Sequence, residues 1–298
     1  MVVMSGPSEA SVRQPAVAGR FYPAEEQACR QEAQSYLRPA EAVAGKRWLG
    51  AIVPHAGWIC SGAVSGQAVA TLAQQGPVDL IVIFGAVHTP IPIQHGALDS
   101  HANWRLPTGG ATIAKDMYAR LESCGNLFAI DDRMHAQEHS IEVNVPLVQL
   151  AFANTPILPI EIPPIGVAEL MGRKTAECIA EAGIRAIYLA STDLTHYGPS
   201  YGFTPAGVGP AAINWAKEND RRLLNLIEKL DAGKIVPEVQ HNHNACGAGA
   251  VAALLGACRQ LGANSAQVLW HTNSYETLAK VHPQPPTHAV GYAAVVVG

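Results

Sequence analysis

The chain has 298 residues, of which 48% are hydrophobic and 15% are charged, and its formal net charge is −4. A composition this apolar predicts a large buried core and excludes extended disorder. Because α/β domains often reach about 250 residues, we expect one domain over residues 1–298, with a flexible start at residues 1–14. The charged residues are spread evenly, without the basic stripe that binding to phosphates requires, so we expect no nucleic-acid partner.

The cysteines and the apolar segments indicate the compartment. Six cysteines lie at wide spacings without a CxxC pair, which is typical of reduced cytosolic thiols. No stretch approaches the roughly 20 apolar residues that span a bilayer, and the first residues lack the pattern of a signal peptide. We therefore expect a cytoplasmic protein without a membrane partner, and its apolar composition is compatible with a homodimer.

Apolar residues at helical spacing and short apolar runs alternate along the chain. In chain order they predict helix 24–37, strand 48–54, helix 61–74, strand 78–85, helices 111–121 and 140–152, strand 155–162, helix 167–182, strand 185–191, helices 210–230 and 245–261, and strands 266–272 and 288–297. This order predicts a three-layer α/β/α fold, with a central, mostly parallel mixed sheet covered by helices on both faces. Ligands of such sheets bind beyond the carboxyl ends of the strands.

Two histidines follow predicted strands in similar surroundings. His55 lies in VPHAGW after strand 48–54, and His88 lies in FGAVHTP after strand 78–85. A single histidine at a loop edge is more often a hydrogen-bonding surface residue than a metal ligand. The repeated combination of a buried strand, glycine, histidine and proline favours ligation for both.

Cys246 lies in HNHNACGAGAV, where the glycine-rich helix 245–261 begins. A helix N-terminus lowers the pKa of a thiol and favours the thiolate that binds a metal or attacks a substrate. A buried thiol without a chemical role is an equally good interpretation of this residue alone. Two imidazoles and a thiolate suit iron, zinc or copper. The nearby His241 and His243 are expected at the surface.

Two further motifs carry candidate acid–base residues. Asp193 and His196 in STDLTHYG would face one cavity if the segment turned helically, and they could then act as an acid–base pair. The alternative for the aspartate is a helix N-cap. In QEHSIEVNVP, Glu142 with His139 could orient a metal ligand, although the same residues could simply open a helix.

Six motifs occur in one order along nearly the whole chain, namely RQPAVAGRFYP, VPHAGW, GAVH, EHSIE, STDLTHYG and CGAGAV. This set resembles the MEMO family, which includes the AmmeMemoRadiSam system protein B. The family is similar in structure to the class III (LigB-type) extradiol dioxygenases, so the resemblance implies an α/β sheet with a mononuclear metal pocket. Transferred residue by residue, it implies the metal ligands His55, His88 and Cys246.

The resemblance also implies residues near the metal, for which we expect catalytic roles: Asp193, His196 and His139. One departure is that GAVHT stands where the family commonly has GPSHH, so a serine and a second histidine are missing at Val87 and Thr89. A thiolate in place of the usual carboxylate of extradiol dioxygenases also means that catechol cleavage does not follow from the fold.

The function expected from these residues is that of a non-haem, Fe(II)-binding redox protein, an O₂-dependent oxidoreductase acting on an unknown small-molecule or peptide substrate. Copper or zinc remains open as the metal. Two alternatives stay open: a non-catalytic adaptor that binds metal or phosphopeptide, and a hydrolase with Cys246 as nucleophile and His196 as base. The resemblance further suggests radical SAM and AMMECR-type partner proteins.

Overall fold

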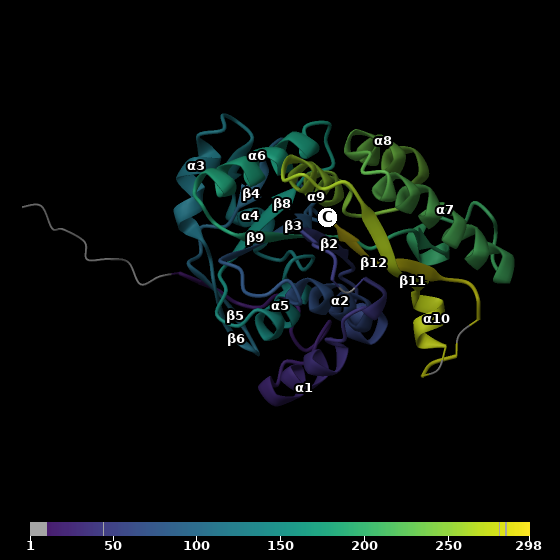
Figure 1. Ribbon diagram of the computed structural model, residues 1–298. Helices are drawn as coiled ribbons and strands as arrows, with labels where there is room; N and C mark the ends of the chain where they lie inside the picture. The colour runs from purple at the N-terminus through teal and green to yellow at the C-terminus, as the bar shows by residue number, and fades with distance from the viewer. Residues whose placement is uncertain (1–10, 44, 280, 284) are drawn as a thin grey trace, which may run out of the picture.

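The computed structural model describes residues 11–43, 45–279, 281–283 and 285–298. Over these residues the main sheet has nine strands (Figure 1). Eight follow in the order β10 (His196–Tyr197), β12 (Ala289–Val297), β2 (Gly50–Val53), β9 (Ala186–Ser191), β3 (Leu80–Ala86), β8 (Ile157–Ile162), β4 (Gly96–Leu98) and β7 (Phe128–Ile130), and β11 (Ala266–Asn273) pairs with β12.

The centre of the sheet is parallel and its flanks are antiparallel. Strands β2, β9, β3 and β8 pair in parallel, whereas β12 pairs antiparallel with β2, and β4 antiparallel with β8. All seven residues of β3 are buried, as expected for a strand whose two faces are both covered. The predicted α/β fold with a mixed sheet and helices on both faces is confirmed.

The helices form the two outer layers (Figure 1). One face carries α6 (Ala168–Glu181), α8 (Ala232–Asn242) and α9 (Ala248–Gln260), and the other carries α1 (Glu26–Tyr36), α2 (Trp58–Ala73) and α5 (Val145–Ala151). The helices α7 (Pro210–Glu228) and α10 (Ser274–Leu278) lie beside β11 and β12. The remaining short elements are α3 (Tyr118–Glu122), α4 (Asp132–His135) and the 3₁₀ turns Glu41–Val43, Lys115–Met117, Glu142–Asn144 and Pro199–Tyr201.

Helix α9 packs against the sheet and against α6 at backbone distance. A Cβ atom added at Gly172 of α6 would meet the Ala253 carbonyl oxygen of α9 at 1.8 Å, and one at Gly249 would meet the Ile162 carbonyl oxygen at 2.4 Å. Only glycine permits such contacts, because any side chain would clash with the neighbouring backbone. The predicted glycine-rich helix over 245–261 is present as α9, and its close packing fixes the start of α9, which Cys246 precedes.

The prediction of a helix over 111–121 is wrong for its first half. Residues Gly109–Thr112 form β6, which pairs with β5 (Asn103–Leu106), and β5 pairs with β1 (Val12–Arg13) in a small second sheet. The alternation of buried and exposed positions around Ala111 follows the period of a strand, and the two glycines before it disfavour a helix.

Two segments differ from expectation in other ways. Helix α8 was not predicted because Pro237 interrupts its pattern, yet the helix continues through this residue. Of the start at residues 1–14 that the sequence predicts to be flexible, residues 1–10 lie outside the described part of the chain. Residues 12 and 13 form β1, and Arg13 is buried.

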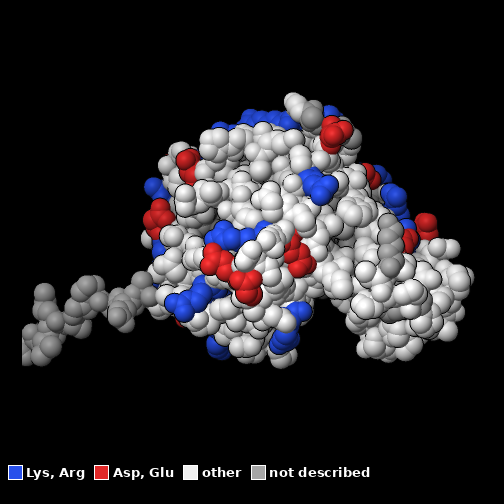
Figure 2. All heavy atoms as spheres, turned by 90° about the horizontal axis from the view of Figure 1, so that it is seen from below, with Lys and Arg blue, Asp and Glu red and all other residues white. Residues whose placement is uncertain are grey.

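On the face seen in Figure 2, lysine and arginine side chains alternate with aspartate and glutamate side chains, and neither sign forms an extended patch there. Among the residues that the structure describes, no helix is both long enough and apolar enough to cross a bilayer.

Candidate metal centre

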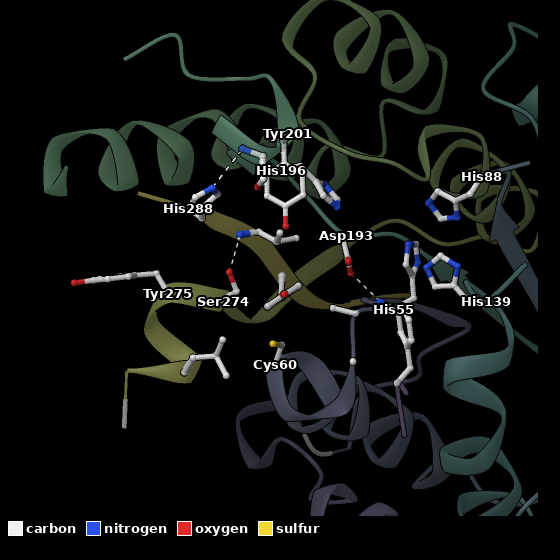
Figure 3. A pocket seen from close by; sticks show the side chains of 17 residues that line it. His55, Cys60, His88, His139, Asp193, His196, Tyr201, Ser274, Tyr275 and His288 are labelled. Atoms are coloured by element: carbon white, nitrogen blue, oxygen red, sulfur yellow. Dashed lines mark hydrogen bonds between the residues drawn. The ribbon is translucent and has the colours of Figure 1, made fainter. Parts of the chain in front are cut away.

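Three neighbouring parallel strands deliver the central residues of the site. His55, Asp193 and His88 each lie two residues beyond the end of their strand, β2, β9 and β3 respectively. These strands are adjacent in the sheet in this order, so their carboxyl ends meet at one edge. The three side chains therefore converge at the edge where α/β sheets bind ligands (Figure 3).

His55 is 2% exposed and is fixed through both ring nitrogens. Its Nδ1 lies 2.9 Å from Ser191 Oγ, and the Ser191 hydroxyl donates its own hydrogen to the Ser140 carbonyl oxygen at 2.6 Å. Ser191 Oγ is therefore the acceptor for the Nδ1–H of His55. The lone pair of a neutral His55 thus lies on Nε2, which is 3.2 Å from Cys246 Sγ.

His88 is fixed by one carboxylate. Its Nδ1 lies 2.8 Å from Glu138 Oε1, and its backbone N–H donates to Glu138 Oε2 at 2.7 Å. Burial opposes ionisation of Glu138, but the hydrogen bonds from His88 and Ser140 prevail and lower the pKa of this carboxyl to about 2. The ionised carboxylate holds the His88 hydrogen on Nδ1, which leaves Nε2 free as an electron-pair donor.

Cys246 reaches the two histidines because its backbone pairs with the segment after β9. The Cys246 N–H donates to the Asp193 carbonyl oxygen at 3.2 Å, and the Asp193 N–H points at Cys246 Sγ at 3.3 Å. The next residue, Gly247, donates its N–H to Thr192 Oγ1, and a Cβ there would meet the Ser191 carbonyl oxygen at 2.4 Å. The glycine is required for this close approach.

The electrostatic environment favours a thiolate at Cys246. Burial alone would raise the pKa of the thiol, but the charge of His55 and hydrogen bonds from His55 and His88 lower it to about 6. For His88, burial would lower the pKa, whereas hydrogen bonds to Cys246 and Glu138 raise it to about 11. These shifts favour a thiolate at Cys246 and a protonated ring at His88.

His139 completes a group of three imidazoles. Its ring stacks on His88 with centroids 4.8 Å apart and lies edge-on to His55 at 5.4 Å. Donor atoms of His55, His88 and His139 all lie within 4.8 Å of one another. Burial lowers the pKa of His139, which favours its neutral form. The residue expected to be catalytic thus lies among the candidate ligands.

Asp193 and His196 line the same cavity, although the helical turn expected to bring them together is absent. His196 instead begins β10, which pairs with β12. Asp193 Oδ1 accepts the His55 backbone N–H at 2.8 Å, and burial raises the pKa of the Asp193 carboxyl. His196 Nδ1 lies 3.0 Å from the Leu194 carbonyl oxygen, which can only accept, so the lone pair of a neutral His196 lies on Nε2.

The expected role of Glu142 as an orienting carboxylate is wrong. Glu142 is fully buried and forms an ion pair with Arg13 at 2.6 Å, and it also accepts a hydrogen bond from the Tyr22 hydroxyl. The carboxylate that orients a candidate ligand is Glu138, four residues earlier. Glu138 is the first residue of the EHSIE motif and precedes His139, and this position was the one indication of its role in the sequence.

Other residues at the site carried no signal in the sequence. Ser191, which orients His55, is the last residue of a buried strand. Tyr201 lines the cavity from a 3₁₀ turn, with its ring edge-on to His196 at 5.1 Å. His241 and His243 are exposed, as expected.

The geometry of these donors fits a transition metal. Metal–sulfur and metal–nitrogen bonds of about 2.3 and 2.0 Å at a tetrahedral angle place the two ligand atoms about 3.5 Å apart. The Cys246 Sγ to His55 Nε2 separation of 3.2 Å is close to this value. The residues present could therefore hold a metal between the Nε2 atoms of His55 and His88 and the sulfur of Cys246.

A second group of potential ligands consists of Asp99, His101 and Asp132. Its carboxylates already have partners, because Asp99 accepts from Trp104 and His101, and Asp132 accepts from the Ser100 backbone N–H. The first group differs in that it consists of imidazoles, and Nε2 of His55 lies 3.2 Å from the thiol of Cys246.

Comparison with known proteins agrees with these motifs. A family model described as Memo-like protein matches residues 13–296. The chain belongs to the MEMO family. Its similar relatives include MEMO1 family proteins from Thermococcus kodakarensis, at 32% identity over 96% of this chain and 99% of the relative, and from Pyrococcus abyssi, at 31% identity over the same shares. A MEMO1 family protein from Methanosarcina acetivorans is 32% identical, again over 96% of this chain.

This MEMO family chain has GAVHT where we expected GPSHH, and the structure shows what the replacing valine contacts. Val87 is half-buried and packs against a small apolar cluster of Ile93, Ala97 and Met134. The side chain that stands in place of the usual serine thus adds apolar contacts beside the site.

The lowered pKa of Cys246 predicts a thiolate at neutral pH in the metal-free protein. The absorbance at 240 nm that depends on Cys246, obtained as the difference between wild type and Cys246→Ser, is expected to rise through a midpoint near pH 6. In denaturant the midpoint should move to about 8.5, the value of a free thiol. His88→Ala should shift the folded midpoint upward, because a hydrogen bond to the thiolate is lost. A folded wild-type midpoint of 8 or above would contradict the described environment.

Proposed function

We propose that this MEMO family protein is a non-haem iron(II) redox protein, in which His55, His88 and Cys246 hold the metal and substrate binds in the adjacent cavity. The cavity has a volume of about 690 Å³ and extends from the imidazoles past Asp193 and Tyr201. This volume is within the range of about 300–1,000 Å³ that small-molecule sites occupy.

One observation carries this proposal: two histidines, each held at Nδ1 by its own partner, lie beside one thiol of lowered pKa, and Nε2 of His55 is 3.2 Å from that thiol. Ser191 and Glu138 each take the Nδ1 hydrogen of one histidine, as the partners of metal-ligating histidines usually do. An imidazole that served only as a hydrogen-bond donor would not need this arrangement. The donor set of nitrogen and thiolate sulfur suits iron, copper and zinc, and iron is preferred on the family resemblance.

A bound iron would supply one-electron chemistry and open coordination positions for O₂ and substrate. Side chains of the protein itself would accept and carry protons during the reaction. His196 presents Nε2 to the cavity and can accept a proton from a substrate hydroxyl. Asp193 holds the backbone of His55 through Oδ1, and its raised pKa allows its carboxyl to carry a proton closer to neutral pH.

A second candidate function is a hydrolase that uses Cys246 as nucleophile. The contact of Cys246 Sγ with His55 Nε2 at 3.2 Å, with Ser191 orienting the ring, is the arrangement of a cysteine–histidine pair. Such a pair needs one histidine, whereas three converge here. His55 would be the base of this pair, in place of His196.

A phosphopeptide-binding adaptor is less well supported by the cavity. Its described lining contains five histidines and three tyrosines but neither lysine nor arginine. Phosphate recognition normally relies on such cations, arginine above all. A role in metal retention without catalysis needs no such cation.

Metal content tests the proposal. Wild-type protein prepared without oxygen should contain close to one iron per chain, and Cys246→Ser and His55→Ala should lose most of it because each removes a ligand. Elemental analysis is the measurement, and Cys60→Ser is the matched control, since Cys60 lines the cavity away from the imidazoles and should leave the iron in place.

Folded wild-type protein that takes up no iron, copper or zinc would contradict the metal site. Alkylation of Cys246 or a thiol-dependent hydrolysis that persists after chelation would then favour the cysteine nucleophile.

Replacing His196 separates catalysis from metal retention. His196→Asn should keep the metal content of wild type, because His196 is not among the proposed ligands, and should lower O₂ consumption with an oxidisable substrate at least 100-fold, a typical effect of losing a general base. An oxygen electrode measures the rate, and elemental analysis gives the metal. Unchanged O₂ consumption would remove His196 from the proposed mechanism.

A further inference from the structure

Two cavities flank the candidate centre. The first, of about 690 Å³, is bordered by His55, His88 and His139. The second, of about 470 Å³, is bordered by the following residues: His196, Tyr201, Gly202, Phe203, Val239, His243, Ala245 and Cys246. The residues common to both linings are His196 and Tyr201.

The candidate ligands divide between the two cavities. The three imidazoles border the first cavity and not the second, whereas Cys246 borders the second and not the first. Cys246 is half-buried, while His55, which contacts its sulfur, is 2% exposed. The part of Cys246 that meets open space therefore lies at the second cavity.

The wall between the cavities is held in place. His196 belongs to β10 and is tied to the Leu194 carbonyl oxygen, and the ring of Tyr201 lies edge-on to it at 5.1 Å. His196 and Tyr201 therefore stand at the border between the two cavities.

Apart from Cys246 itself, the second cavity is lined by apolar residues, one tyrosine and two histidines. Phe203 and His243 have ring centroids 5.6 Å apart, and Val239 and Ala245 add aliphatic surface. None of the residues that line it is Lys, Arg, Asp or Glu. An ion entering this space would meet no Lys, Arg, Asp or Glu side chain to replace its hydration, so the lining favours small uncharged molecules.

We infer that the second cavity is a separate access route to Cys246. Through it a small uncharged reactant reaches the sulfur of Cys246 without passing through the first cavity, which the imidazoles line. This inference rests on the proposed function in one respect, namely that Cys246 is a ligand of the metal centre. A site with two routes can admit an organic substrate on one side and a small co-reactant on the other.

The test follows alkylation of single cysteines in metal-free protein with iodoacetamide, an uncharged reagent, by peptide mass spectrometry. Val239→Trp fills the second cavity and should slow the modification of Cys246 at least 10-fold. Leu278→Trp narrows the first cavity and should leave that rate within two-fold of wild type. Cys60, which borders the first cavity, is an internal control whose rate Val239→Trp should not change.

Matched variants keep the inference testable if Val239→Trp does not fold. Val239→Phe should slow the modification of Cys246 to a smaller degree, and Val239→Ala should leave it unchanged or faster. Thermal unfolding checks that each variant is native.

Slowing of Cys246 by Leu278→Trp, or an undiminished rate in both Val239→Trp and Val239→Phe, would overturn the inference. Because the assay needs neither metal nor substrate, such a result would leave the metal site itself standing. A failure to bind metal would conversely leave these rates as predicted.

Discussion

The hydrogen bonds at Nδ1 of His55 and His88 are the interactions on which the centre depends. Each fixes the ring orientation and holds a hydrogen on Nδ1, and Nε2 of His55 then lies 3.2 Å from Cys246 Sγ. The two histidines reach this state through different partners, a serine hydroxyl and a carboxylate. Burial lowers the pKa of His55, whereas hydrogen bonds to Cys246 and to the charged Glu138 outweigh burial and raise the pKa of His88.

These partners are themselves held by a buried network. Arg13 of β1 donates to the carbonyl oxygens of His135 and Glu138 and pairs with Glu142. Arg13 therefore holds the segment 135–142, which contains Glu138 and His139, near both of its ends. A buried ion pair is costly to form but more costly to break, since loss of one partner leaves an uncompensated charge. The first strand of the described chain therefore supports the centre without touching it.

Much of the fold followed from the sequence because buried parallel strands have a simple signature. The strands that end before His55, His88 and Asp193 are continuous apolar runs, and they lie within one or two residues of their predicted positions. The small sheet formed by β1, β5 and β6 was missed, because its strands are short and depend on partners that are distant in the sequence. Helix α8 was missed because Pro237 disfavours a helix in the sequence, whereas packing of the folded chain stabilises the helix despite this proline.

The site was predictable to the extent that its residues sit in motifs. His55, His88, Cys246, Asp193 and His196 were named from the sequence, and the structure brings all five to one edge of the sheet. No role was predicted for Glu138, and Glu142 was given a possible orienting role, because which of two nearby carboxylates faces a ligand depends on where the segment turns. The division of the ligands between two cavities depends on loops that no sequence pattern positions.

X-ray absorption at the metal edge of the iron-loaded protein tests the central claim most directly. The account predicts one sulfur neighbour at about 2.3 Å together with imidazole nitrogens at about 2.0–2.1 Å, distances typical of transition-metal thiolate and histidine ligands. Cys246→Ser should lose the sulfur contribution and keep the imidazole pattern. A first shell made only of oxygen and nitrogen in the wild-type protein would contradict the claim that Cys246 binds the metal.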